Sequence, residues 1–166
     1  MTIRLATSQD IPEILRLLRL KAVFDGCPGG VSATAERLDA TLFSEQPMAY
    51  ILLVLRQDDT SAIGFASYHF TYSTFLAKPS IWLDDLYLEP DYRNQSIGTR
   101  LFERLCEVAA RHDCGRIDWT VDINNEAGIR FYQRMGAQLQ KGVCLCRMNR
   151  EGISRVCERP STGGPE

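Results

Sequence analysis

The sequence predicts an α/β protein with one domain, in which helices cover a single mixed sheet. The chain has 166 residues, which suits one domain and allows a hydrophobic core without disulfide or metal staples. Apolar residues recur with strand and helix periods in the order β-α-α-β-β-β-α-β-α-β. The formal net charge is −2, which gives no electrostatic footprint for nucleic acid.

The first elements are a strand and a helix. Residues 2–6 alternate between polar and apolar side chains, as a half-buried strand does. Asp10 and Pro12 then mark a helix start. Apolar side chains follow at helical spacing: Ile11, Ile14, Leu15, Leu18 and Ala22. We expect one face of this helix to be buried.

A loop and a second helix follow. The glycine-rich run 25–30 breaks the first helix. A shorter helix is expected over 32–43, with Ser32 or Thr34 as its N-cap. Three strands come next, over 49–56, 61–73 and 79–90. The first of these runs is almost wholly apolar, and the others are rich in β-branched and aromatic residues.

The last predicted elements alternate between helix and strand. A helix from residue 97 to about 112 carries one apolar face: Ile97, Leu101, Leu105, Val108 and Ala109. A strand over 114–122, a short helix over 125–137 and a closing strand over 144–148 follow. From Asn149 onward the composition turns polar. We therefore expect a domain over 1–148 and a polar C-terminal tail over 149–166 that is either frayed or ordered only by a partner.

Composition also argues against several classes of protein. No apolar run reaches the roughly 20 residues that a membrane-spanning helix needs, and the N-terminus lacks the apolar stretch of a signal peptide. The six cysteines include no Cys-x-x-Cys pair, and there are only two histidines. We expect reduced thiols, no metal site, no membrane or nucleic-acid partner, and a cytoplasmic location.

One stretch, 90–105, reads as a loop that becomes an amphipathic helix. Such a junction suits a phosphate group, because the first N–H groups of a helix have no partner within it. Gly98 allows close backbone approach, while Arg93 and Arg100 add positive charge. Ser96 stands where a second glycine is expected, and its side chain is also suited to capping a helix. Taken alone, the stretch fits either a cofactor site or an ordinary capped helix.

Two adjacent carboxylates interrupt the apolar strand at Asp84 and Asp85. Aspartate is depleted in strands, and adjacent residues normally point to opposite faces of a sheet. At least one of the two must therefore face the core or lie at a β-bulge, which would also free backbone N–H groups. The alternative is an acid at the edge of the strand, paired with an arginine.

The third feature is the short helix near residue 130. Asn124 or Asn125 is expected to cap it, and Phe131 and Tyr132 fall on its apolar side. Aromatic residues on such a helix often belong to the core. A tyrosine hydroxyl can nevertheless donate a proton to a departing thiolate.

In combination, these features resemble the GNAT family of N-acetyltransferases. An acidic strand precedes a phosphate-binding helix start, and a further strand precedes an Asn-capped helix that ends in Phe-Tyr. The match runs from Ile3 to about Met148 and is carried mainly by "LDDLYLEPDYRNQSIGTRLF" and "NNEAGIRFYQRMGA". Within the family, the chain looks most similar to the spermidine/spermine and diamine acetyltransferases. The resemblance implies a single-domain GNAT fold, a mostly antiparallel twisted sheet with helices on both faces.

The resemblance also implies a site for acetyl-CoA as co-substrate. The family motif falls on "RNQSIG", so Arg93 and the backbone N–H groups of Asn94, Gln95, Ser96, Ile97, Gly98 and Thr99 would hold the pyrophosphate. Leu86, Tyr87 and Leu88 would pair with the pantetheine amides as an added strand, and one N–H there would face the thioester oxygen. Asn125 would contact the cofactor, and Tyr132 would be the general acid toward the sulfur.

The acceptor side follows from the same resemblance. Asp84 and Asp85 would hold a cationic amine, and Asp84 would remove its proton, through water. Phe24 and Asp25 match an aromatic–acid pair that lines the acceptor site of relatives. Direct transfer to a primary amine of a small molecule is thus implied. Relatives also form dimers, so a homodimer is expected.

Departures from the family pattern leave the acceptor and the activity open. Ser96 replaces the usual first glycine, Asp84 is one methylene shorter than the common glutamate, and the segment after Leu139 looks shorter than in polyamine enzymes. The acceptor could be a diamine, a polyamine, a lysine-like amine or a protein lysine. An acyl-CoA sensor without turnover, or an enzyme with a longer acyl donor or a hydroxyl acceptor, would also fit the sequence.

Overall fold

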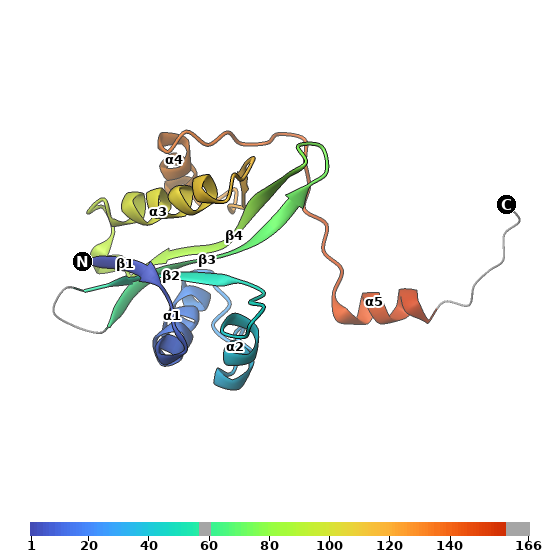
Figure 1. Ribbon diagram of the computed structural model, residues 1–166, viewed down its shortest axis with the longest axis horizontal. Helices are drawn as coiled ribbons and strands as arrows, with labels where there is room; N and C mark the ends of the chain where they lie inside the picture. Colours follow the sequence, from blue (N-terminus) through green and yellow to red (C-terminus); the bar gives the residue numbers. More distant parts are fainter. Residues whose placement is uncertain (57–60, 159–166) are drawn as a thin grey trace, which may run out of the picture. The chain divides into compact units, whose positions relative to one another are not determined.

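A five-stranded sheet forms the centre of the described chain, which comprises residues 1–56 and 61–158 of the computed structural model (Figure 1). The strands lie side by side in chain order: β1 (Thr2–Leu5), β2 (Tyr50–Leu55), β3 (Ala62–Ser73), β4 (Lys78–Leu88) and β5 (Ile117–Asp118). Neighbouring strands run antiparallel, except that β4 and β5 are parallel. This mixed, mostly antiparallel sheet confirms the predicted fold class.

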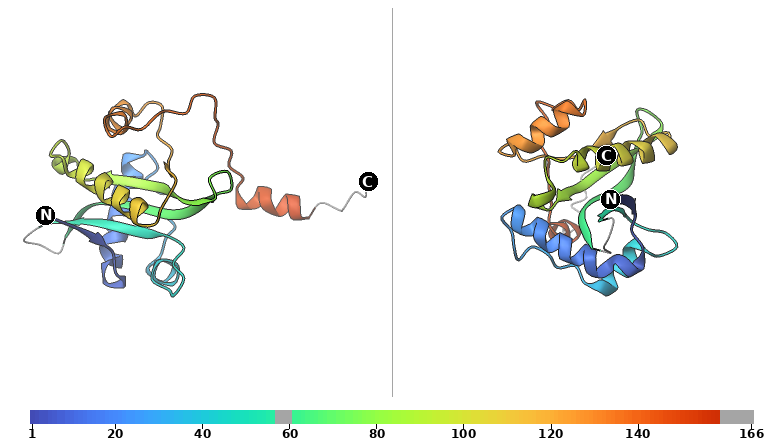
Figure 2. Two further views of the ribbon diagram at one scale, coloured as in Figure 1. Left: turned by 45° about the horizontal axis from the view of Figure 1, so that its top comes forward. Right: turned by 90° about the vertical axis from the view of Figure 1, so that its left-hand side faces the viewer.

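Helices cover both faces of this sheet, as predicted. α1 (Ile11–Phe24) and α2 (Ala35–Leu42) lie on one face, and α3 (Ile97–Arg111) lies on the other (Figures 1 and 2). Short 3-10 turns, η1 (Ser8–Asp10) and η2 (Pro90–Tyr92), precede α1 and α3. α4 (Glu126–Arg134) and α5 (Arg150–Cys157) belong to a second compact unit, 126–166, which we describe separately from the first unit, 1–125.

The core on the α1 side is a cluster of buried apolar residues. It consists of Ile14, Leu17, Ile51, Leu53, Ala62, Phe65 and Tyr87. The sequence predicts Ile14 on the buried face of α1, and the structure adds Leu17, which is fully buried. Burying a side chain of this size stabilises a fold by about 1.5–3 kcal/mol, so the cluster anchors α1 against the sheet.

The α3 side is packed as the sequence predicts. All five apolar residues predicted for the helix face are buried: Ile97, Leu101, Leu105, Val108 and Ala109. Phe102 joins them, with its ring 5.5 Å from that of Trp119. At the other end of the helix, His112 packs against Phe70, with 4.7 Å between ring centroids.

Capping interactions fix where the early helices begin. The Asp10 carboxylate accepts hydrogen bonds from the Arg4 guanidinium at 2.7 and 2.8 Å and from the Thr7 N–H at 2.7 Å. The hydrogen bond from Arg4 is the main reason that the pKa of Asp10 falls to about 2. Thr34, rather than Ser32, caps α2, with its hydroxyl oxygen accepting the N–H of Arg37 at 3.3 Å.

Two predicted strands differ from the structure. The strand predicted over 114–122 shrinks to Ile117–Asp118, which pair with Ile81 and Trp82. Residues 144–148, predicted to close the sheet, contain no strand in the described chain. A segment becomes a strand only where its backbone forms hydrogen bonds with the edge of another strand. The large apolar side chains of this run, Leu145 and Met148, are largely exposed here.

The C-terminal tail is more ordered than predicted. Residues 150–157 form α5, and the Asn149 side chain caps it by accepting the N–H of Gly152 at 2.9 Å. Of the two alternatives for the tail, fraying is wrong for these residues, because an Asn cap and helical spacing favour helix even in a polar context. Residues 159–166 lie outside the described part of the chain. The boundary at 148 stays a prediction.

Among the described residues, no helix is both long and apolar enough to span a bilayer.

Candidate functional site

A β-bulge places the two adjacent carboxylates on the same face of the sheet. Asp85 pairs with Ser67 and Leu83 pairs with Tyr68, so Asp84 is the extra residue of β4. The Ser67 hydroxyl donates to Asp85 at 3.4 Å, and the His69 ring nitrogen Nδ1 lies 3.0 Å from Asp84. Because Ser67 and His69 share one face of β3, both carboxylates point to the α1 side. Of the alternatives considered for the Asp-Asp pair, the structure shows the β-bulge.

Lys21 joins this acidic pair to the end of α1. Its ammonium group forms an ion pair with Asp85 at 3.1 Å and another with Asp25. The Lys21 side chain is 18% exposed, less than either carboxylate. Burial acts to lower the pKa of Lys21, but the hydrogen bond to Asp25 and the charge of Asp85 outweigh it and raise that pKa above its ordinary value. Lys21 is therefore a charged residue inside the predicted acceptor site.

His69 and Lys21 are the residues of this candidate site that sequence reasoning misses. His69 lies on β3, 15 residues from Asp84 along the chain, and meets it only because of the bulge in β4. Lys21 reads as one more polar residue of an amphipathic helix. The ion pair between Lys21 and Asp25 could have been predicted from the sequence, because residues four apart are neighbours on a helix.

Phe24 and Asp25 reach the same region, as the resemblance implies. The Phe24 ring lies 6.1 Å from that of Tyr87. Arg93 lies over both rings, 4.6 Å from Phe24 and 5.8 Å from Tyr87, and donates to the Leu88 carbonyl at 3.0 Å. Arg93 thus links α1, the end of β4 and the turn that leads to α3. Of the predicted acceptor residues, Asp25 and Asp85 share Lys21 as an ion-pair partner, Phe24 lies beside Tyr87, and Asp84 contacts His69.

The second half of β4 presents an edge that β5 does not cover. β5 pairs with β4 at Ile81 and Trp82, whereas Leu86, Tyr87 and Leu88 pair with β3 on their other side. Within the described residues, the pairing with β5 ends before this segment begins. Backbone N–H and C=O groups on such an edge can pair with an extended chain. The segment runs directly into the turn before α3.

The turn before α3 holds two residues in the left-handed backbone region. Asn94 has φ 59° and Ser96, the N-cap of α3, has φ 60°. The Ser96 side chain forms no capping hydrogen bond with the helix, so the capping role considered for it is wrong. Its conformation is one that glycine adopts at little cost. The backbone therefore keeps the glycine-like turn although the residue is serine.

The first turn of α3 favours an anion. It contains no acidic residue. Unpaired N–H groups and the positive end of the helix dipole gather at such a terminus. Gln95 closes the loop by donating to the Asp91 carbonyl at 2.8 Å. Residues 94–99 thus have the backbone arrangement that the predicted pyrophosphate site needs.

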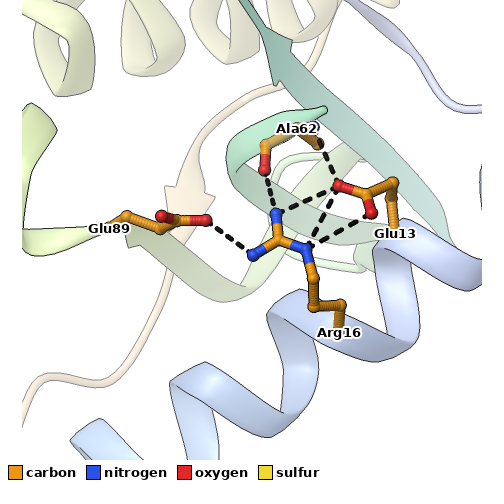
Figure 3. A network of polar contacts seen from close by, with 4 residues as sticks. All are labelled: Glu13, Arg16, Ala62 and Glu89. Atoms are coloured by element: carbon orange, nitrogen blue, oxygen red, sulfur yellow. Dashed lines mark hydrogen bonds and ion pairs between the residues drawn. The ribbon is translucent and has the colours of Figure 1, made fainter. Parts of the chain in front are cut away.

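An arginine network holds α1 against the strand that leads to this turn (Figure 3). Arg16 forms ion pairs with Glu13 at 3.0 Å and with Glu89 at 2.7 Å, and also donates to the Ala62 carbonyl. Glu13 accepts the N–H of Ala62 at 3.0 Å. Glu89 directly follows β4 and precedes η2. The network therefore fixes the start of the turn relative to α1.

The two remaining predicted residues lie at and beyond the boundary between the units. Asn125 directly precedes α4, in a turn where its N–H donates to the Asp122 carbonyl at 2.9 Å. Tyr132 lies on α4, and its ring contacts that of Phe131 with 5.1 Å between centroids. The Tyr132 carbonyl accepts the N–H of Ala137 at 3.0 Å, which closes the end of the helix. The roles of both residues stay predictions.

Comparisons with known proteins agree with this architecture. The model of the "Acetyltransferase (GNAT) family" matches residues 17–137. A solved structure, an integron cassette protein from the mobile metagenome of V. cholerae, superposes with a TM-score of 0.77 at 21% identity, covering 95% of this chain and 98% of that one.

Curated proteins are similar in sequence as well. Spermidine/spermine N(1)-acetyltransferase-like protein 1 of Homo sapiens is 32% identical over 159 residues, or 91% of this chain. The match spans only 23% of that protein's length. Thialysine N-epsilon-acetyltransferase of Mus musculus is 30% identical over 142 residues, covering 82% of this chain and 83% of that protein.

Proposed function

Because this chain belongs to the GNAT family of acetyltransferases, we propose that it transfers an acetyl group from acetyl-CoA to the primary amine of a small molecule. Membership of this family confirms the resemblance seen in the sequence. It also confirms that the class of enzyme is N-acetyltransferase. The observation that carries the proposal is the bulge in β4. It brings Asp84 to His69 and Asp85 to Ser67 and Lys21, directly before the open edge 86–88.

Acetyl-CoA is assigned to the edge and the turn. The open edge of Leu86, Tyr87 and Leu88 would pair with the pantetheine amides, which places the thioester beside the bulge. Arg93 and the backbone N–H groups of 94–99 would hold the pyrophosphate, with Asn125 as a further contact. The first turn of α3 supports this assignment because it lacks acidic residues. Ser96 fits the site because its backbone, not its side chain, carries the binding group.

The acceptor amine is assigned to the carboxylates on the α1 side. Alkylamines are mostly protonated at neutral pH, so a base must remove a proton before the nitrogen attacks. Asp84 would hold the ammonium, and His69, 3.0 Å from Asp84, would accept the proton directly or through water, in place of the base role that the resemblance implies for Asp84. Imidazole suits this task because its neutral ring nitrogen can accept a proton. Asp84 then orients the ring and stabilises its charge.

The remaining steps complete the transfer. The amine nitrogen forms a bond to the thioester carbonyl carbon while a backbone N–H of the 86–88 edge stabilises the developing oxyanion. The carbon–sulfur bond would then break, with Tyr132 donating a proton to the departing thiolate, and the second proton lost by the amine nitrogen would return Tyr132 to its neutral form. No acyl-enzyme intermediate is required, so both substrates bind together.

Assembly and location complete the proposal. Val143, Leu145 and Met148 are 75%, 60% and 59% exposed, and they lie in a stretch outside any helix or strand. We propose that this stretch becomes ordered against a second copy of the chain in a homodimer, because exposed apolar side chains of this kind favour association. The six cysteines are free, which suits a reducing cytoplasm.

Two experiments test the activity. Acetyl-CoA at millimolar concentration should raise the melting temperature, because a ligand that binds the folded state stabilises it. Release of free thiol should then follow addition of a small primary amine. No melting shift would contradict the cofactor assignment. Binding without thiol release from any small amine would favour an acyl-CoA sensor, and thiol release only with lysine-containing proteins would favour a protein-lysine acetyltransferase.

A further inference from the structure

The acceptor site contains a cation of its own. Lys21 lies between Asp25 and Asp85, with Nζ 3.1 Å from the Asp85 carboxylate and hydrogen-bonded to that of Asp25. It is the least exposed member of this group, at 18%, compared with 41% for Asp25 and 29% for Asp85. A lysine ammonium is itself an alkylammonium ion, so Lys21 stands where the second charge of a diamine would otherwise be attracted.

The ion pairs around the site leave one carboxylate for a cationic ligand. Three carboxylates lie on the α1 side: Asp25, Asp84 and Asp85. Lys21 forms ion pairs with two of them, Asp25 and Asp85. Asp84 has no ion pair with a lysine or arginine among the described residues, and its partner is His69.

We propose that Lys21 determines the acceptor class, so that the enzyme prefers an amine with one net positive charge over a diamine or polyamine. This inference rests on the proposed function, in which these carboxylates line the acceptor site. The reacting ammonium binds at Asp84. A second ammonium group at the far end of the acceptor would approach Asp25 and Asp85. Lys21 already neutralises these carboxylates and repels the second ammonium group. An amine with a neutral or zwitterionic far end avoids that repulsion.

The test compares two amines of equal length, n-pentylamine and 1,5-diaminopentane, with acetyl-CoA saturating. For the wild-type enzyme, kcat/KM for the diamine should not exceed that for the monoamine by more than the statistical factor for two equivalent amino groups. Lys21→Met should raise the diamine-to-monoamine ratio about tenfold, because one repulsive charge near a partly exposed site is removed. The change should appear mainly in KM for the diamine.

Matched variants separate charge from structure. Lys21→Arg keeps the charge and should leave the ratio near the wild-type value. Arg19→Met removes one charge from an exposed position of the same helix and should leave the ratio unchanged. Lys21→Gln provides a second neutral variant if Lys21→Met unfolds, which thermal melting would reveal. A ratio that is unchanged in the folded neutral variants, or a wild-type preference for the diamine beyond the statistical factor for two amino groups, overturns the inference.

Binding measurements keep this test distinct from that of the activity. Calorimetric titration of both amines into the acetyl-CoA complex requires no turnover. If pentylamine binds more tightly than the diamine and Lys21→Met reverses this order, the inference is supported even when no thiol is released. The lack of thiol release would then contradict only the proposed activity. Thiol release with an unchanged ratio supports the activity and overturns the charge inference. If neither amine binds, the inference and the acceptor assignment both fail.

Discussion

At the scale of single residues, Ser96 holds a backbone conformation that serine rarely adopts. Its φ of 60° lies in the left-handed region, where a Cβ atom is crowded by the neighbouring carbonyl. Its side chain gives no capping hydrogen bond in return. The turn is therefore maintained by its surroundings, including the Gln95 bond to Asp91 and the Arg93 bond to Leu88.

Ser96→Gly should therefore stabilise the protein. Glycine adopts φ near +60° without strain, so we expect the free energy of unfolding to rise by about 0.5–1 kcal/mol, with the affinity for acetyl-CoA maintained or increased. Urea denaturation measures the first quantity and calorimetry the second. Ser96→Ala is the control, because it removes the hydroxyl but keeps the strain. Equal stability of the two variants would contradict the interpretation.

His69→Gln should impair proton removal without affecting the cofactor. Glutamine retains a polar group beside Asp84 but cannot accept the amine proton. We expect kcat/KM for the amine to fall about 100-fold, with acetyl-CoA binding unchanged. His112→Gln is the control, since His112 packs against Phe70 on the opposite face of the sheet. If His69→Gln and His112→Gln have the same pH–rate profile, His69 is not the base.

Tyr132→Phe should lower kcat and leave acetyl-CoA affinity nearly intact. Removing a general acid typically costs 10²–10⁴-fold, so we expect a fall of at least about 100-fold in single-turnover experiments. Tyr72→Phe is the matched control, because Tyr72 is 66% exposed near the β3–β4 hairpin. Unchanged turnover in Tyr132→Phe would remove this hydroxyl from the mechanism.

At the scale of elements, β3 and β4 pair so closely that one position requires glycine. A Cβ atom on Gly64 would lie 2.4 Å from a Leu88 methyl carbon and 2.5 Å from the Tyr87 carbonyl oxygen. Gly64 pairs with Leu88, so it lies directly behind the open edge assigned to acetyl-CoA. The absence of a side chain at Gly64 therefore sets the position of this edge.

Gly64→Ala should destabilise the fold and weaken acetyl-CoA binding together. Relieving contacts of this kind forces the backbone to shift, at a cost of about 1–3 kcal/mol. Thermal melts with and without acetyl-CoA measure both effects. Gly29→Ala is the matched control, because a Cβ at Gly29 would meet nothing within 4 Å. A Gly64→Ala variant as stable as Gly29→Ala would contradict the observed register.

Elements also show where sequence reasoning succeeds. The five apolar positions of α3 are all buried, because a strong 3.6-residue period is local information. The bulge is inferable because two adjacent carboxylates do not fit regular alternation. The partner of Asp84 is not, because the bulge shifts the β3–β4 register and only the folded pairing brings His69 beside it. Residues 144–148 have the composition of a strand. Composition does not reveal whether a neighbouring strand is available for their backbone to pair with.

At the scale of the whole molecule, acid stability depends on the junction between β1 and α1. The pKa of Asp10 is lowered from 3.8 to about 2, chiefly by its hydrogen bonds with Arg4. A folded-state pKa below the unfolded one means that this stabilisation is complete above pH 4 and is lost as the pH falls toward 2. The shift corresponds to about 2 kcal/mol, reduced somewhat by the exposure of Arg4.

Asp10→Asn should therefore lower the free energy of unfolding at pH 7 by about 1–2 kcal/mol and have little effect at pH 2. Urea denaturation between pH 2 and 7 measures this difference. Asp113→Asn is the control, because the Asp113 side chain is 80% exposed and its ion pair with Lys78 contributes little. A constant difference between wild type and Asp10→Asn over that range would contradict the linkage.

The central claim concerns the whole molecule: acetyl-CoA on the 86–99 segment delivers its acetyl group to an amine held at the bulge. Acetyl-CoA labelled with ¹³C at the acetyl carbonyl, mixed with the enzyme and n-pentylamine, tests it most directly by NMR. We predict that the label appears in N-pentylacetamide, with one free thiol per acetamide. Label that stays in acetyl-CoA, or appears only in acetate, would contradict the claim.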